Sequence, residues 1–137
     1  MNLSSGLEMV LRFLLAAGLG ACVGYQRERA GKAAGMRTHI LVGSGAALFT
    51  LVSIYGFAGS TADISRVAAG VVAGIGFIGA GVILRGMSGA GVAGLTTATT
   101  IWITAAIGLA VGTGMYLISI IATAVTVGVL FLPKVRG

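Results

Sequence analysis

The fold of this chain is decided by residues 95–132, which read LTTATTIWITAAIGLAVGTGMYLISIIATAVTVGVLFL and carry no charged side chain. At about 1.5 Å per residue, a single helix of this length would be nearly twice as long as the roughly 30 Å hydrocarbon core of a bilayer. The stretch must therefore fold back. We expect the turn at Gly112-Thr113-Gly114, because glycine accepts the backbone angles of a tight turn. The sequence thus predicts two consecutive membrane-spanning helices, at residues 95–112 and 115–132.

Three more apolar runs precede this stretch, near residues 7–25, 38–57 and 67–84. Each is close to the about 20 residues that a spanning helix needs. The 137 residues are 57% hydrophobic and 9% charged, whereas an average soluble domain is roughly 25% charged. We therefore expect a single all-α domain over residues 1–137, a polytopic membrane protein built as a bundle of about five transmembrane helices.

Basic residues gather on one side of this predicted bundle. They lie in the first loop, the third loop and the C-terminal tail: Arg27, Arg29, Lys32, Arg37, Arg85, Lys134 and Arg136. Lysine and arginine accumulate on the cytoplasmic side of membrane proteins, so the N-terminus is predicted outside and the C-terminus inside. Because these residues lie between apolar runs, we expect contact with the lipid bilayer and no nucleic-acid partner, despite a net charge of +6.

Glu8 and Arg12 are the charged residues that fall inside a predicted span. Their i, i+4 spacing allows them to pair on one helix face. Charges inside spans are costly and often functional. Two interpretations therefore stay open, a mutually neutralised structural pair and an ion or proton site.

The third apolar run is rich in glycine, and we expect it to form the central helix of the bundle. Its glycines are Gly70, Gly74, Gly76, Gly79 and Gly81. The run GIGFIG fits the dinucleotide pattern G-x-G-x-x-G, but it lies in an apolar helix and no acidic residue follows Asp63, so no cofactor is expected. We interpret these glycines as helix-packing residues, within one chain or between chains, and from the glycine faces we expect a homodimer.

Two further glycine pairs have the four-residue spacing that lets helices approach closely, Gly20 with Gly24 and Gly108 with Gly112. Trp102 lies in the middle of the fourth predicted span. Because tryptophan otherwise gathers at the membrane interfaces, we expect Trp102 to pack inside the bundle.

Threonines recur in the fourth predicted span. Thr96, Thr100 and Thr104 share one helix face, with Thr97 beside it. Their hydroxyls can bond back to the carbonyls of their own helix, or they can line a polar path for an ion or water, and both interpretations stay open. Three acids, one histidine and one cysteine are too few and too scattered for a catalytic site of known type, so no enzyme activity is expected.

Several motifs of the chain resemble the MgtC/SapB family. They are GACVGYQRE at residues 20–28, AGMRTH at 34–39, AA followed by GIGFIGAG within 68–81, and GLTT followed by IW within 94–102. The resemblance implies a multi-pass protein of the bacterial inner (plasma) membrane with five spans. The family is linked to adaptation to low magnesium, to virulence and survival inside macrophages and, in one branch, to inhibition of the proton-driven ATP synthase.

The residues that fit the family pattern form two groups. The first is the cytoplasmic collar, which we define as Arg27, Glu28, Gly35, Arg37, Thr38, Arg85, Thr96 and Thr97. Within it, Glu28 is expected to pair with one of the cations and to clamp the first loop against the bundle. The second group, Asp63 and Arg66, is expected on the outer face, where Asp63 caps the third helix.

The longer members of the family carry a soluble C-terminal cytoplasmic domain, whereas this sequence stops at Gly137. The chain is either a short, membrane-only member or a piece of a longer protein. Functions that depend on that domain stay open.

Two classes of function remain. The first is a regulatory membrane protein that binds another membrane complex, such as ATP synthase, through its small-residue helix faces. The second is a transporter or channel for magnesium, protons or another small solute, suggested by the acids Glu8 and Asp63 and by the threonine face with Thr100 and Thr104. Magnesium prefers oxygen ligands in near-octahedral geometry, for which three acids on two sides of a membrane form a poor cage, and no metal ligand is assigned.

Overall fold

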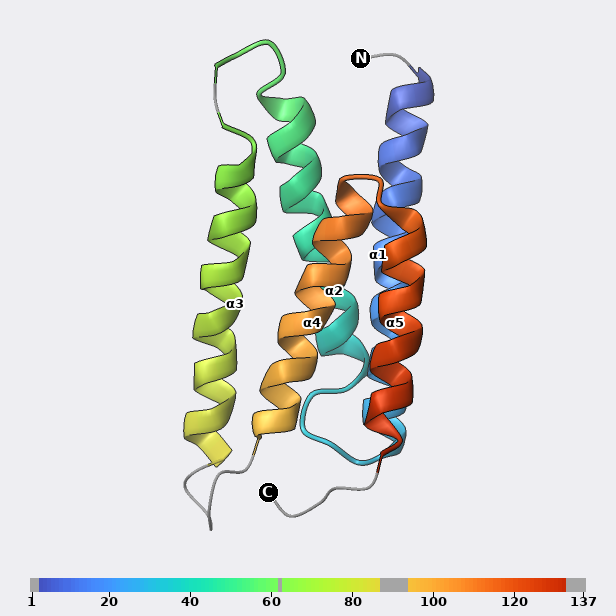
Figure 1. Cartoon of the computed structure of the whole chain (residues 1–137), viewed down its shortest axis with the longest axis vertical. Helices are drawn as coiled ribbons and strands as arrows, with labels where there is room; N and C mark the ends of the chain where they lie inside the picture. Colours follow the sequence, from blue (N-terminus) through green and yellow to red (C-terminus); the bar gives the residue numbers. More distant parts are fainter. Residues whose placement is uncertain (1–2, 62, 87–93, 133–137) are drawn as a thin grey trace.

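The computed structural model describes residues 3–61, 63–86 and 94–132. In this part of the chain every regular element is a helix, as Figure 1 shows. The elements are α1 (Leu3–Arg29), α2 (Met36–Leu51), the π-helical segment η1 (Val52–Gly56) that continues α2, α3 (Ser65–Gly86), α4 (Leu95–Gly112) and α5 (Tyr116–Leu130). The predicted all-α bundle is confirmed.

Four segments are long and apolar enough to cross a membrane, namely α1, α2 together with η1, α3 and α4. The fifth helix, α5, has 15 residues, which gives about 22 Å of helix against about 30 Å of hydrocarbon. It packs against α1 and α4, and α1 begins and α5 ends at opposite ends of the bundle (Figure 1). Which end faces the cytoplasm stays a prediction.

We name the two ends of the bundle after two arginines of α1. The Arg12 end contains the start of α1, the loop between α2 and α3, and the turn between α4 and α5 (Figure 1). The Arg27 end contains the end of α1, the loop of residues 30–35 and the start of α4 (Figure 1).

The turn between α4 and α5 forms where the two glycines stand. Gly114 has a φ of 88°, in the left-handed region that favours glycine. Its N–H donates to the carbonyl of Val111 at 2.9 Å, which closes the end of α4. The predicted turn is confirmed.

The central helix is α4, which packs against each of the other four α-helices. The prediction that the third apolar run is central is wrong, because α3 lies at the edge of the bundle and packs mainly on α4 (Figure 1). Among its glycines Gly79 is the one that faces a neighbour, since a Cβ there would lie 3.5 Å from Ala98 Cβ. A Cβ would meet nothing within 4 Å at the others, Gly70, Gly74, Gly76 and Gly81.

Trp102 also departs from expectation. Its side chain is 54% exposed on α4, so it does not pack inside the bundle of a single chain. A hydropathy pattern cannot separate an apolar side chain that faces lipid from one that faces protein, because both environments accept it.

Both predicted glycine pairs lie at helix crossings. Gly20 lies where α1 crosses α2, and a Cβ there would collide with the carbonyl oxygen of His39. Gly108 lies where α4 crosses α2, and a Cβ there would collide with the carbonyl oxygen of Gly43. The second members of the pairs, Gly24 and Gly112, are equally close to α2. Their role in close packing is confirmed.

Candidate functional site

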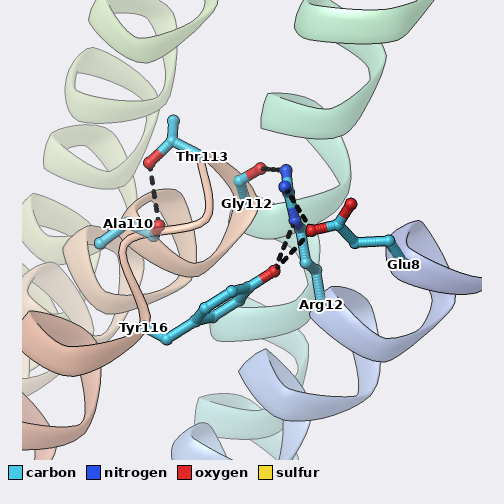
Figure 2. A network of polar contacts seen from close by, with 6 residues as sticks. All are labelled: Glu8, Arg12, Ala110, Gly112, Thr113 and Tyr116. Atoms are coloured by element: carbon cyan, nitrogen blue, oxygen red, sulfur yellow. Dashed lines mark hydrogen bonds and ion pairs between the residues drawn. The ribbon is translucent and has the colours of Figure 1, made fainter. Parts of the chain in front are cut away.

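A polar network at the Arg12 end joins α1 to the turn between α4 and α5 (Figure 2). Arg12 donates from Nε to the Tyr116 hydroxyl, from Nη1 to the Gly112 carbonyl and from Nη2 to Glu8 Oε1, each at 2.9 Å. The Tyr116 hydroxyl in turn donates to Glu8 Oε1 at 3.2 Å. A cation beside the last carbonyls of α4 also complements the negative end of the helix dipole.

The i, i+4 pairing of Glu8 with Arg12 is confirmed. The structure adds Tyr116 and the Gly112 carbonyl, which sequence reasoning missed because they lie about a hundred residues away in the chain. Gly114 makes the approach possible, since a Cβ there would lie 3.1 Å from Arg12 Nη2. An ion or proton role for Glu8 stays a prediction.

A second polar cluster lies at the Arg27 end, inside the bundle. Arg27 stands in the last turn of α1, and its side chain is 4% exposed. Its Nη2 donates to Thr97 Oγ1 of α4 at 2.6 Å, whereas its buried Nε has no hydrogen-bond partner in the part of the chain that the structure describes. The ion pair found among these residues is Glu8 with Arg12, so Arg27 has no carboxylate partner there.

His39 is completely buried beside this arginine. Its Nδ1 lies 2.8 Å from the Gly35 carbonyl and its Nε2 lies 3.2 Å from Thr100 Oγ1. A carbonyl can only accept, so Nδ1 carries the proton that this hydrogen bond requires. Sequence reasoning missed His39 as a site residue. The sequence did contain a signal for it: His39 lies between Gly35 and Gly43, and glycines on both sides of a residue indicate a segment that packs closely against a neighbouring helix.

The threonines of α4 divide between two faces. Thr97, Thr100 and Thr104 are buried, whereas Thr96 is exposed. Hydroxyls of this row turn back onto their own helix, with Thr100 donating to the Thr97 carbonyl at 2.7 Å and Thr104 to the Thr100 carbonyl at 2.6 Å. The geometry thus fits the back-bonding interpretation, and a polar path along this face stays a prediction.

Glu28 holds the first loop through a backbone contact. It forms no ion pair among the described residues, and because the side chain of Arg85 lies outside them, its predicted pairing with a cation stays a prediction. Its Oε1 instead accepts the Met36 N–H, the first of α2, at 3.3 Å. A Cβ at Gly35 would lie 2.6 Å from this oxygen, so the glycine leaves room for the carboxylate. Glu28 therefore clamps the first loop by bonding to the backbone, which is oriented for it at a helix start.

The remaining collar residues are more peripheral. Arg37 is exposed and Thr38 is half-buried on the first turn of α2. The side chain of Arg85, near the end of α3, lies outside the described part of the structure. The described part of the collar thus contains one buried pair, Arg27 with Thr97, and one loop clamp made by Glu28.

Asp63 and Arg66 lie at the Arg12 end, both exposed. Asp63 Oδ1 accepts the N–H and the hydroxyl of Ser65 at 3.0 and 2.7 Å, which confirms the cap at the start of α3. These two hydrogen bonds lower the pKa of Asp63 below its ordinary value. Both residues border an open cavity of about 580 Å³ with Ser53 and Thr61.

Comparison with known proteins identifies the family. The MgtC family model matches residues 13–136. The chain belongs to the MgtC family. The match takes in Arg27, His39 and Thr97, so the cluster at the Arg27 end lies inside the region shared with the family, whereas Glu8 and Arg12 precede it.

This MgtC family chain is similar to three curated relatives and spans part of the length of each. It is 48% identical over 129 residues to "Putative magnesium transporter YhiD" of Escherichia coli, which covers 90% of the chain and 59% of that protein. It is 47% identical over 128 residues to SrpB of Synechococcus elongatus, covering 85% of the chain and 70% of SrpB. It is 44% identical over 114 residues to MgtC of Salmonella typhimurium, covering 83% of the chain and 47% of MgtC. No solved structure matches it.

Proposed function

We propose that this MgtC family chain is a regulatory membrane protein, not an enzyme, that binds another membrane complex in the bacterial inner membrane. The observation that carries the proposal is the bare small-residue face of α3. Gly70 and Gly74 would meet nothing within 4 Å if they carried a Cβ, whereas Gly20 and Gly108 are in backbone contact with α2. Close approach through small residues is a main source of helix association in lipid. A face of this kind on α3 is therefore available to a helix of another protein.

The same face borders a groove between α2 and α3. The groove has a volume of about 570 Å³, and apolar residues of both helices line it, including Gly45, Gly70 and Gly74. A partner helix seated there would contact two helices at once. We propose this groove as the docking surface for the partner complex.

We further propose a role in adaptation to low magnesium or to virulence stress, with ATP synthase as the candidate partner, as the resemblance of the sequence motifs implies. Homodimerisation through the same glycines is the competing use of this surface. Both uses share one physical cause, the packing of backbone against backbone where side chains are small.

A second candidate function is transport of magnesium, protons or another small solute. It is favoured by the name of the relative "Putative magnesium transporter YhiD". The interior described here favours it less. No group of three or more His, Cys, Asp or Glu that could hold a metal ion occurs among the described residues, and the guanidinium of Arg27 places a positive charge inside the bundle where a cation would be repelled.

Affinity purification from bacterial inner membranes tests the first proposal. We expect ATP synthase subunits to copurify with the tagged chain and with Gly76→Leu, and to be lost at least tenfold with Gly74→Leu. Gly76 is the matched control, because it is equally open and lies on another side of α3. Equal recovery of ATP synthase from both variants, or recovery of further copies of the chain alone, would count against the proposal.

Purified protein in liposomes tests the second. We expect neither magnesium nor proton flux under an imposed gradient. Flux that disappears in Glu8→Ala or Thr100→Val would instead establish transport and overturn a purely regulatory role.

A further inference from the structure

Arg27 is a buried charge that has no acidic partner among the described residues. The sequence contains three acidic residues, Glu8, Glu28 and Asp63. Each has another partner: Arg12 for Glu8, the backbone at the start of α2 for Glu28, and Ser65 for Asp63. The side chain of Arg27 is 4% exposed, and its one hydrogen bond within the described residues goes to a neutral hydroxyl.

Such an arrangement is unfavourable in isolation. A buried ion is tolerated where it is paired and hydrogen-bonded, because removal from water costs far more than one neutral hydrogen bond returns. The buried Nε of Arg27 has no partner among the described residues either. The guanidinium therefore has both charge and hydrogen-bonding capacity to offer to an anion.

A second source of positive potential lies at the same place. Thr97, which accepts the hydrogen bond of Arg27, belongs to the first turn of the 18-residue helix α4. Gly94 precedes this helix, and no side chain of the described residues caps its first N–H groups. A helix start carries a partial positive charge and presents N–H groups to anions. Arg27 and the start of α4 thus attract the same kind of ligand instead of neutralising each other.

The surroundings at this end favour the same ligand. Arg29, Lys32 and Arg37 are exposed on the end of α1, the following loop and the start of α2. The Thr97 hydroxyl accepts from Arg27, so its own proton can be donated to a bound oxygen. Arg27 stands in the last turn of α1, at the depth where a spanning helix meets lipid headgroups.

We propose that Arg27, the Thr97 hydroxyl and the N-terminus of α4 form a binding site for a phosphate group. The planar guanidinium matches two phosphate oxygens at once, which a lysine cannot do. The group is supplied either by an anionic phospholipid headgroup or by a soluble phosphate compound. This site is separate from the groove between α2 and α3, so its test does not depend on the proposed function.

Ligand-dependent stabilisation of the purified full chain tests the site. One arm compares nanodiscs of phosphatidylglycerol with nanodiscs of phosphatidylcholine. The other titrates inorganic phosphate, at constant ionic strength, into the phosphatidylcholine sample. We expect a concentration-dependent rise in the unfolding temperature in at least one arm. A rise with phosphatidylglycerol alone identifies the lipid as the source, and a rise with inorganic phosphate alone identifies a soluble compound.

Variants separate the site from general attraction to a basic surface. Arg27→Gln should abolish the ligand-dependent rise, Arg27→Lys should weaken apparent affinity at least tenfold, and Thr97→Val should weaken it several-fold. Arg37→Gln is the matched control, because it removes an exposed arginine at the same end and should lower the apparent affinity far less than Arg27→Gln does. If Arg27→Gln fails to fold, the lysine and Thr97→Val variants still decide the question.

Two results would overturn the proposal. One is an equal rise in Arg27→Lys, Thr97→Val and the unmodified chain, which would show that the phosphate acts elsewhere. The other is the absence of any rise in both arms, which would leave a carboxylate of a partner protein as the charge that meets Arg27.

Discussion

At the residue scale, Arg12 and Arg27 of α1 show how one type of side chain acts in two ways. Arg12 uses its three donor nitrogens on Tyr116, Gly112 and Glu8, and so joins the start of the chain to the turn between α4 and α5. Among the described residues, Arg27 donates from one side-chain nitrogen, to Thr97, and its side chain is more deeply buried than that of Arg12. We conclude that Arg12 acts as a structural crosslink, whereas Arg27 remains able to bind a further ligand.

Loss of the Tyr116 hydroxyl should weaken this crosslink. Tyr116→Phe removes the group that accepts from Arg12 and donates to Glu8. We expect the free energy of unfolding to fall by about 0.5–1.5 kcal/mol, the usual net value of a hydrogen bond. Tyr25→Phe is the control, because it removes a hydroxyl that bonds within α1 to Arg29. Denaturation in detergent micelles measures both, and equal losses would contradict the crosslink.

The cap of α3 predicts a pH dependence. The pKa of Asp63 lies below its ordinary value of 3.8, because Ser65 donates two hydrogen bonds to the carboxylate. A carboxyl whose pKa is lowered on folding contributes stability above its unfolded pKa and loses it as the pH falls through its folded pKa.

The difference in unfolding temperature between the unmodified chain and Asp63→Ala should therefore be constant from about pH 5 to 8 and should shrink below about pH 4. Thermal unfolding across this range measures it. A difference that is unchanged at pH 2 would show that the carboxylate's charge plays no part.

At the element scale, the helix crossings depend on where glycine stands. The α2–α4 crossing has no room for a Cβ at Gly108, because it would meet the backbone oxygen of Gly43. The edge helix α3 has ample room at Gly76. Gly108 and Gly76 are thus predicted to differ in how well they tolerate substitution by a larger residue.

Gly108→Ala should lower the free energy of unfolding by about 1–3 kcal/mol, because the backbones must separate to admit the methyl group. Gly76→Ala should leave stability unchanged or raise it by up to about 1 kcal/mol, since alanine favours the helix. Unfolding in the same micelles compares the two. A large loss in Gly76→Ala would reveal a contact on α3 from outside the single chain.

At the scale of the whole molecule, the orientation in the membrane follows from charge. Basic residues concentrate at the Arg27 end, which is therefore predicted to be cytoplasmic. In a Cys22→Ser background, Ser60→Cys at the Arg12 end should label with an impermeant reagent from outside intact spheroplasts. Lys32→Cys at the other end should label after lysis. Labelling of Ser60→Cys from the cytoplasm alone would invert the topology.

The sequence by itself determined the features that depend on local patterns. Hydropathy placed the helices, two glycines placed the turn at Gly114, and four-residue spacing identified the Glu8–Arg12 pair and the tight glycine pairs Gly20 with Gly24 and Gly108 with Gly112. These features can be read from sequence because helix period, backbone freedom and side-chain size act over a few residues. The family motifs likewise contain Arg27 and Thr97, whose side chains form a hydrogen bond in the structure.

Only the tertiary structure decided which helix is central and which polar residues meet. It placed α4 instead of α3 in the middle, left Trp102 exposed, buried His39 against Thr100, and brought Arg12 to Tyr116. In lipid, an apolar helix surface is equally acceptable facing the bilayer or another helix, so hydropathy carries no information about packing order. That order arises from the fit between distant surfaces, and it is what buries Arg27 beside Thr97, with no acidic partner among the described residues.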